Sequence, residues 1–280
     1  FLVISGLVIG FIPHVLDIIL EPDLVFLIFL PPLLYSAAWN MAWKDFAKNW
    51  RPISLLALGL VLFTSVAVAL VATWLIPGFT LALGFLLGGI ISPPDPIAAS
   101  SVMQKIKMNR RVLVILEGEG LVNDAVSLIV FRFALAAVLT GQFVLWKAGI
   151  DFMVAASGGI AIGLAIGGVI YVLHRYLPTT SSIDTGITVI SPYLMYIAAE
   201  HFGLSGVLAV VSGGLFLSSR STAVFSFSTR LQSQGFWDTL VFLMNGSVFI
   251  LIGLQLPSIL ASLEPGTLGR NVHYGVIISL

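Results

Sequence analysis

Long uninterrupted apolar runs constrain this chain more than any other feature. Residues 53–76 contain no charged side chain, and about 20 apolar residues suffice for a helix to cross a bilayer. Lipid offers no hydrogen bonds to backbone N–H and C=O groups, so a spanning segment must satisfy them internally. Closed β-barrels also do this, but their strands alternate apolar and polar residues over about ten positions. The runs here are continuous, which predicts an all-α polytopic membrane protein.

The composition excludes an ordinary water-soluble domain. Charged residues make up 9% of the chain and the mean hydropathy is +1.07, whereas soluble domains carry about 25% charged residues. The lipid bilayer is therefore the expected surrounding. The chain has no cysteine, which excludes disulfides and thiolate metal sites. Its formal net charge of zero gives no reason to expect nucleic acid as a partner, and no cofactor is expected.

Ten apolar segments can be marked along the sequence. They are roughly 1–12, 23–39, 52–76, 80–103, 111–139, 149–173, 184–203, 204–218, 236–257 and 272–280. The first and last are too short to span a bilayer, so we expect a portion of a longer protein that is truncated at both ends. No linker or composition shift divides the chain, and we predict a single, partial transmembrane domain over 1–280.

The basic residues orient these segments. With ten segments, one side of the membrane receives Lys44, Lys48, Arg51, Lys105, Lys107, Arg110, Arg111, Arg175, Arg220 and Arg230. The other side receives only Lys147 and Arg270. Basic residues collect on the cytoplasmic side, so the even-numbered segments are expected to end inside. If 184–218 were one span, Arg220 and Arg230 would lie on the outer side, against this distribution of basic residues. We therefore predict two spans there.

A cluster of prolines interrupts the segment at 80–103. In the sequence Ser92-Pro93-Pro94-Asp95-Pro96, each proline lacks the N–H that would bond to the carbonyl four residues earlier. Broken backbone at membrane depth is tolerated where it lines a cavity or packs in protein. Freed carbonyls beside the Asp95 carboxylate are hard oxygen ligands suited to an alkali cation, and transporters place their sites at discontinuous helices. The alternative is a proline-rich loop with a capping Asp, which leaves 80–91 too short to span.

Acidic and amide residues gather on the segment at 111–139. Glu119 and Asn123 are spaced i,i+4, and Glu117 and Asp124 i,i+7, so each pair shares a helix face. Asp124 lies about 20 Å from the cytoplasmic start of that helix, near the bilayer middle. Ionisable side chains at that depth are costly and mark sites or pathways. Glu117 fits the interface equally well.

Three other features allow more than one interpretation. Arg132 can extend its side chain to the membrane surface or pair with an acid. Glu200 lies near a segment end, which favours an interfacial position. Gly203-Leu204-Ser205-Gly206 matches the Gly-x-Ser-Gly of rhomboid-type intramembrane proteases, but a tight turn between two spans explains it as well. The protease also needs a histidine from a later helix, for which His273 is the candidate.

Several motifs together resemble the cation:proton antiporter family of bacterial NhaP-type antiporters and animal sodium/hydrogen exchangers. They occur in family order over nearly the whole chain. They are Phe29–Tyr35 (FLPPLLY), Ser92–Pro96 (SPPDP), Leu116–Ala125 (LEGEGLVNDA), Leu204–Ala209 (LSGVLA) and Phe249–Pro257 (FILIGLQLP).

The resemblance implies a fold of two inverted repeats with discontinuous crossing helices, and a homodimer. A core domain would move against a dimerisation domain. The resemblance also implies that Asp124 binds the cation or proton, that Asn123 marks an electroneutral branch, and that Asp95 belongs to a broken crossing helix. Glu119 would pair with an arginine on the helix that starts near Asn271. Pro94 stands where the family usually has threonine.

These residues suggest exchange of protons for a monovalent cation, Na⁺ first, around one carboxylate. Burial favours a protonated Asp124, whereas hydrogen bonds and a bound cation favour the ionised form. Asp124, Asn123 and Asp95 are the predicted ligands, with Asp124 and Asp95 holding the alkali cation transiently. Glu119, Ser92, Pro94 and Pro96 support them. The alternatives are a passive cation channel and, more remotely, an intramembrane serine protease. We predict a secondary transporter that is not an enzyme.

Replacing the predicted carrier gives the first test. Asp124→Asn should abolish exchange without preventing membrane insertion, because it removes a charge that is costly in lipid and leaves packing unchanged. Cation-driven pH change in vesicles measures exchange, and membrane fractionation measures insertion. Wild-type exchange by Asp124→Asn would show that another group carries the ion.

Overall fold

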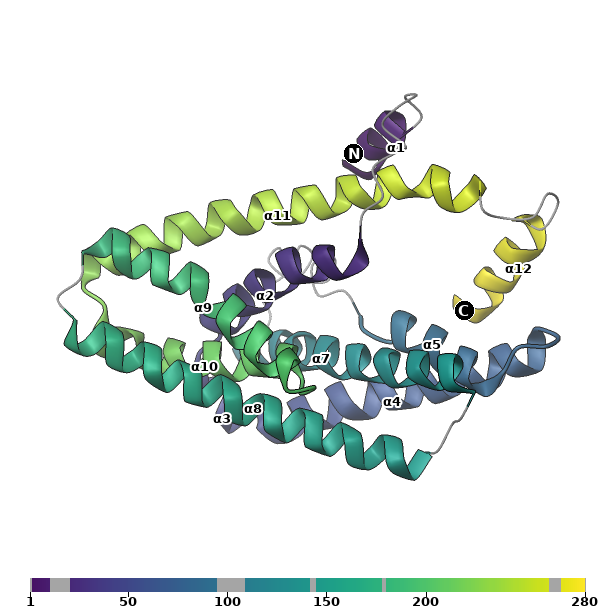
Figure 1. The fold of residues 1–280 in the computed structure, drawn as a ribbon, viewed down its shortest axis with the longest axis horizontal. Helices are drawn as coiled ribbons and strands as arrows, with labels where there is room; N and C mark the ends of the chain where they lie inside the picture. The colour runs from purple at the N-terminus through teal and green to yellow at the C-terminus, as the bar shows by residue number, and fades with distance from the viewer. Residues whose placement is uncertain are drawn as a thin grey trace.

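The computed structural model describes residues 2–10, 21–94, 109–141, 145–177, 180–261 and 268–279, and the regular elements in those ranges are helices (Figure 1). They are α1 (Leu2–Gly10), α2 (Pro22–Asn40), α3 (Trp43–Lys48), α4 (Trp50–Leu75), α5 (Leu81–Ile91), α7 (Arg110–Thr140), α8 (Leu145–Tyr176), α9 (Ser181–His201), α10 (Gly206–Val224), α11 (Phe227–Ala261) and α12 (Leu268–Ser279). Within the described residues, five helices are long and apolar enough to cross a membrane.

Each predicted apolar segment overlaps one of these helices. The prediction of two spans within 184–218 is confirmed, because α9 ends at His201 and α10 begins at Gly206. Gly203 has a φ of 67° in the connecting turn, a left-handed conformation that glycine adopts at little steric cost. Ser205 caps α10 by accepting a hydrogen bond from the Leu208 N–H at 3.2 Å. The tight-turn interpretation of these residues is therefore correct.

Two features differ from the predicted segments. The short helix α3 lies in the stretch expected to connect two spans. The predicted start of a segment at 236 is wrong, since α11 begins at Phe227. Its polar first turns are held against α9 by side-chain hydrogen bonds, among them Thr229 to Ser181 at 3.0 Å and Thr185 to Ser233 at 2.8 Å. Hydropathy alone does not register such a polar contact between helices.

Helix α2 continues through two prolines. Pro31 and Pro32 lie inside it, and Pro32 cannot donate to the carbonyl of Ile28, four residues earlier. The hydroxyl of Tyr193 on α9 donates to that carbonyl instead, at 3.1 Å. A side chain from a neighbouring helix thus replaces the lost backbone hydrogen bond.

Helices α4, α5 and α7 pack together as one bundle, hereafter the first bundle. A Cβ added at Gly88 of α5 would lie 2.7 Å from the Cα and carbonyl oxygen of Ser65 on α4. One added at Gly89 would lie 3.0 Å from the Phe131 nitrogen on α7. Glycine therefore allows α5 to approach both neighbours closely. Gly118 of α7 faces Ile53 of α4, and further along both helices Ser65 of α4 and Phe131 of α7 contact the adjacent Gly88 and Gly89 of α5. Helices α4 and α7 therefore run parallel.

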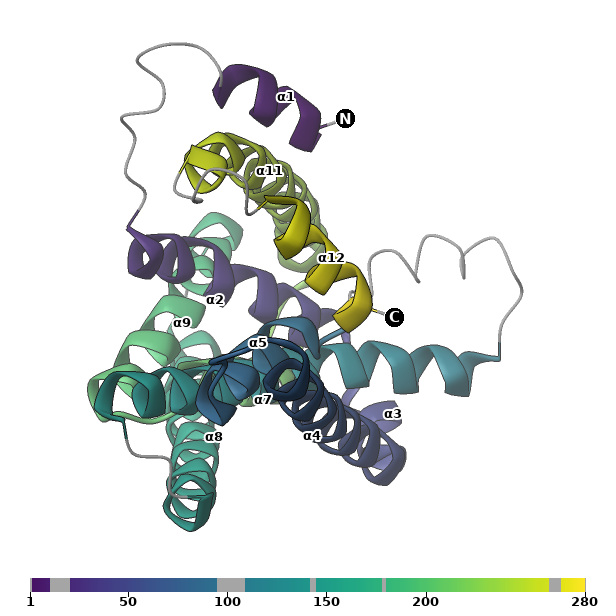
Figure 2. The ribbon, with the colours of Figure 1, turned by 90° about the vertical axis from the view of Figure 1, so that its right-hand side faces the viewer.

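Helices α2, α8, α9, α10 and α11 form a second bundle, in which α2, α8 and α9 pack on α10 and α11 packs on α2 and α9. Helix α1 lies on α11 (Figure 2). The apolar core of the second bundle includes Tyr35 of α2, Met195 of α9, Val210 of α10 and Trp237 of α11.

Many of the outward-facing side chains of both bundles are large and apolar, as in Phe63 of α4 and Phe242 and Leu243 of α11, which suits a lipid surrounding. The chain is an integral membrane protein.

The close approach of α4 and α5 is testable. Gly88→Ala should lower the melting temperature in detergent, because its methyl group would push apart two backbones already in contact, at a cost of about 1–3 kcal/mol. Gly59→Ala on α4 is the matched control, since a Cβ there meets nothing within 4 Å. Equal melting temperatures for the two variants would show that α4 and α5 are not closely packed.

Candidate ion-binding site

The middle of α7 carries buried polar side chains. Asn123 is fully buried and Glu119 is 6% exposed, one helical turn apart on the same face. Asp124 is half-buried. Ser127 is buried, and its hydroxyl donates to the Asp124 backbone carbonyl at 3.0 Å. The helix thus places an amide and two carboxyl groups within two turns.

Helix α5 ends where the prolines predicted an interruption. Its last residue is Ile91, and Ser92 forms the C-cap with its N–H donating to the Gly88 carbonyl at 2.9 Å. Pro94 is not helical. Asp95 and Pro96 lie outside the residues that the structure describes, so their proposed part in the site remains a prediction. The end of α5 confirms that the helix does not continue through Pro93 and Pro94.

Buried polar atoms without a hydrogen-bond partner concentrate in the first bundle. Within the described part of the chain five of the seven such atoms are Ser65 Oγ of α4, Ser92 Oγ at the end of α5, and Glu119 Oε1, Asn123 Nδ2 and Asn123 Oδ1 of α7. The other two, the Tyr35 hydroxyl of α2 and His174 Nε2 of α8, lie in the second bundle. An unsatisfied buried polar group costs about 1–3 kcal/mol, and native structures retain few of them. Oxygen atoms from hydroxyl, amide and carboxyl groups are the ligands that a hard monovalent cation or a proton requires.

Ser65 was not among the residues singled out from the sequence. It lies within the apolar run at 53–76, where a lone serine is a weak signal. The Tyr35 hydroxyl, which is also buried and without a partner among the described residues, lies in the same apolar core as Leu121 and Ala125 of α7. Only the packing of separate helices brings these hydroxyl groups beside α7.

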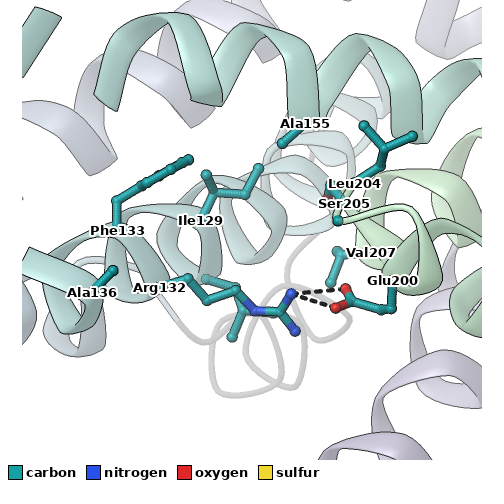
Figure 3. Close-up of a pocket in the computed structure, with 11 residues that line it drawn as sticks. Ile129, Arg132, Phe133, Ala136, Ala155, Glu200, Leu204, Ser205 and Val207 are labelled. Atoms are coloured by element: carbon teal, nitrogen blue, oxygen red, sulfur yellow. Dashed lines mark hydrogen bonds and ion pairs between the residues drawn. The ribbon is translucent and has the colours of Figure 1, made fainter. Parts of the chain in front are cut away.

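Arg132 pairs with an acid, which decides between its two interpretations. Its Nη1 lies 2.8 Å from Glu200 Oε1 and 2.6 Å from Oε2, and its Nη2 donates to the Tyr196 hydroxyl at 3.3 Å (Figure 3). The interfacial assignment of Glu200 is therefore incomplete, because the carboxylate contacts a charge from another helix. The signal in the sequence was a basic residue inside a span, which needs an acidic partner.

Comparison with known proteins places this geometry in context. The sequence profile described as "Sodium/hydrogen exchanger, transmembrane" matches residues 1–279. The chain is 35% identical over 260 residues to a "Sodium, potassium, lithium and rubidium/H(+) antiporter" of Bacillus pumilus, covering 91% of this chain and 39% of that protein. It is 34% identical over 259 residues to the "Na(+)/H(+) antiporter ApNhaP" of Aphanothece halophytica, covering 91% of this chain and 49% of that protein.

A solved structure shares the fold. The sodium proton antiporter MjNhaP1 from Methanocaldococcus jannaschii at pH 8 matches with a TM-score of 0.69 and 20% sequence identity, over 90% of this chain and 63% of that one. The chain thus spans about 40 to 50% of the length of the two curated relatives above.

Proposed function

The chain belongs to the family of transmembrane sodium/hydrogen exchangers, and on this premise we propose that it is a secondary active antiporter that exchanges protons for a monovalent cation, Na⁺ first. The observation that carries the proposal is a set of buried polar atoms on α4, α5 and α7 for which the described residues supply no hydrogen-bond partner. A transported cation would be bound by the oxygen atoms of this set during part of the cycle. The names of the bacterial relatives support both substrates.

Asp124 is the proposed carrier. A carboxyl group in an apolar setting favours its protonated form, and a bound cation favours its ionised form, so the two ions compete for one group. Asn123 would contribute a neutral amide beside it, and Ser92 a hydroxyl at the end of α5. Glu119 is buried on the same face as Asn123 and would support the site. Asp95, with the carbonyls freed by Pro94 and Pro96, would complete the ligand set.

Coupling requires that the site change its exposure only when Asp124 is occupied. We propose that the first bundle moves as a unit against the second, because its helices are closely packed on one another and make fewer contacts with α2 and α10. A mobile unit that is neutral when loaded crosses the apolar region at least cost. A homodimer is proposed from the family resemblance, and the plasma membrane of a bacterium is the proposed location, as the bacterial relatives suggest.

Transport in liposomes tests the proposal. The protein is reconstituted with a pH-sensitive dye inside, and NaCl, LiCl, KCl or choline chloride is added outside. An antiporter moves protons only when a transported cation is supplied, and Asp124→Asn should remove the signal. Cation flux without proton movement would support a channel instead, and no flux of either ion would contradict the transport proposal.

The residue beside the carrier should set the charge balance. One carboxylate that alternates between one proton and one monovalent cation moves no net charge, so exchange by the wild-type protein should not respond to an imposed membrane potential. Asn123→Asp should make exchange voltage-dependent, because two adjacent carboxylates titrate as a coupled pair and can carry an additional proton. Exchange that stays insensitive to voltage in Asn123→Asp would mean that Asn123 does not determine stoichiometry.

A further inference from the structure

A cavity of about 230 Å³ lies where the two bundles meet at one end of α7. It is lined by α7, by Ala155 of α8, and by the end of α9 with the following turn and the start of α10. Figure 3 shows the Arg132 side chain reaching from α7 across this space to Glu200. Apolar side chains surround the pair, including Ile129, Phe133 and Val207. The ion pair bridges the two bundles at the edge of this cavity, with 45% of the Arg132 side chain and 28% of the Glu200 side chain exposed.

The pair is held by more than its own charges. Glu200 Oε1 also accepts a hydrogen bond from the Gly206 N–H at 3.1 Å. Gly206 is the first residue of α10, where the helix dipole favours a negative charge. The Tyr196 hydroxyl supports the guanidinium from α9. Helices α9 and α10 therefore fix the carboxylate on the second bundle, and Arg132 fastens the first bundle to it.

The position of Arg132 connects this contact to the candidate ion site. It lies eight residues beyond Asp124 on the same helix, about 12 Å along the axis. Contacts of 2.6–2.8 Å cannot persist if α7 slides by several ångströms relative to α9. A partly exposed ion pair favours the arrangement in which it forms by up to about 1 kcal/mol.

We propose that Arg132 and Glu200 are a positioning pair that holds α7 against the α9–α10 hairpin in this arrangement and separates in each transport cycle. The pair would thereby set the balance between the two access states. This inference rests on the proposed exchange function. It assigns a specific role to two charged residues that do not belong to the candidate ion site.

Breaking the pair should shift this balance. Glu200→Gln removes the ionic attraction and keeps the size of the side chain, so this arrangement becomes less populated. The apparent KM for the cation should then rise by about two- to fivefold on one side of the membrane and fall on the other. The charge-exchanged double variant Arg132→Glu/Glu200→Arg should recover part of the effect. A purely structural role would instead lower the rate or the yield of protein, with both KM values unchanged.

Cross-linking tests whether the pair must separate. The chain has no cysteine, so Arg132→Cys/Glu200→Cys introduces the sole thiols for a short reducible bifunctional methanethiosulfonate. Linked protein should lose exchange, and a reducing agent should restore it. The control is Ile160→Cys/Ser212→Cys, which links α8 to α10 inside the second bundle, where Ser212 Oγ lies 3.4 Å from the Ile160 carbonyl. This link should leave exchange intact. Full exchange by the protein linked at 132 and 200 would overturn the proposal.

A distance measurement separates this inference from the transport proposal. Spin labels at Ala136→Cys and His201→Cys leave the ion pair intact, and pulsed electron resonance reports the α7–α9 separation without any need for transport. Two distance populations are expected, with the longer one enlarged by Glu200→Gln. If both populations occur in protein that exchanges no ions, the positioning pair stands and the transport proposal fails. A single distance that Glu200→Gln does not change would overturn the positioning pair.

Discussion

The absence of water in the bilayer core governs this structure, because every backbone hydrogen bond there has to be supplied by the protein. Where the chain breaks the helical pattern, a neighbour compensates. Pro32 leaves the Ile28 carbonyl without its usual donor, and Tyr193 of α9 provides one. Helix α5 ends at Ile91, with Ser92 as its C-cap, directly before Pro93 and Pro94. Among the described residues, the buried polar atoms of α4 and α7 that have no hydrogen-bond partner belong to the same bundle as this helix end.

Close packing turns α4, α5 and α7 into a single unit. Small residues at the contacts, notably Gly88 and Gly89, bring the backbones of three helices together. This geometry matters because van der Waals contact replaces the hydrophobic effect as the force between helices in lipid. Because these three helices pack tightly on one another, they hold the Asp124 region of α7 within one rigid unit. This unit makes fewer contacts with α2 and α10 of the second bundle. The Arg132–Glu200 ion pair is a specific connection across that sparse interface.

Polar contacts also organise the second bundle. Trp237 of α11 donates to the Thr188 hydroxyl of α9 at 3.1 Å, in line with the Thr185–Ser233 and Ser181–Thr229 contacts nearer the helix start. These bonds run along one seam between α9 and α11. They satisfy hydroxyl groups that would be costly in lipid, and they explain why α11 extends well beyond its apolar part.

The sequence by itself determined the helical class, the positions of the apolar segments, the end of α5 before the prolines, and the polar face of α7. Each depends on local physics: hydropathy, the missing proline N–H, and the helical period. Tertiary structure decided which groups meet. Arg132 finds Glu200 across 68 positions of sequence, Tyr193 finds the Ile28 carbonyl, and the polar start of α11 becomes helical against α9. Asn123 and Ser65 become buried through helix packing alone. Such contacts depend on how helices are arranged in space, and no local pattern in the chain encodes the distance between side chains on different helices.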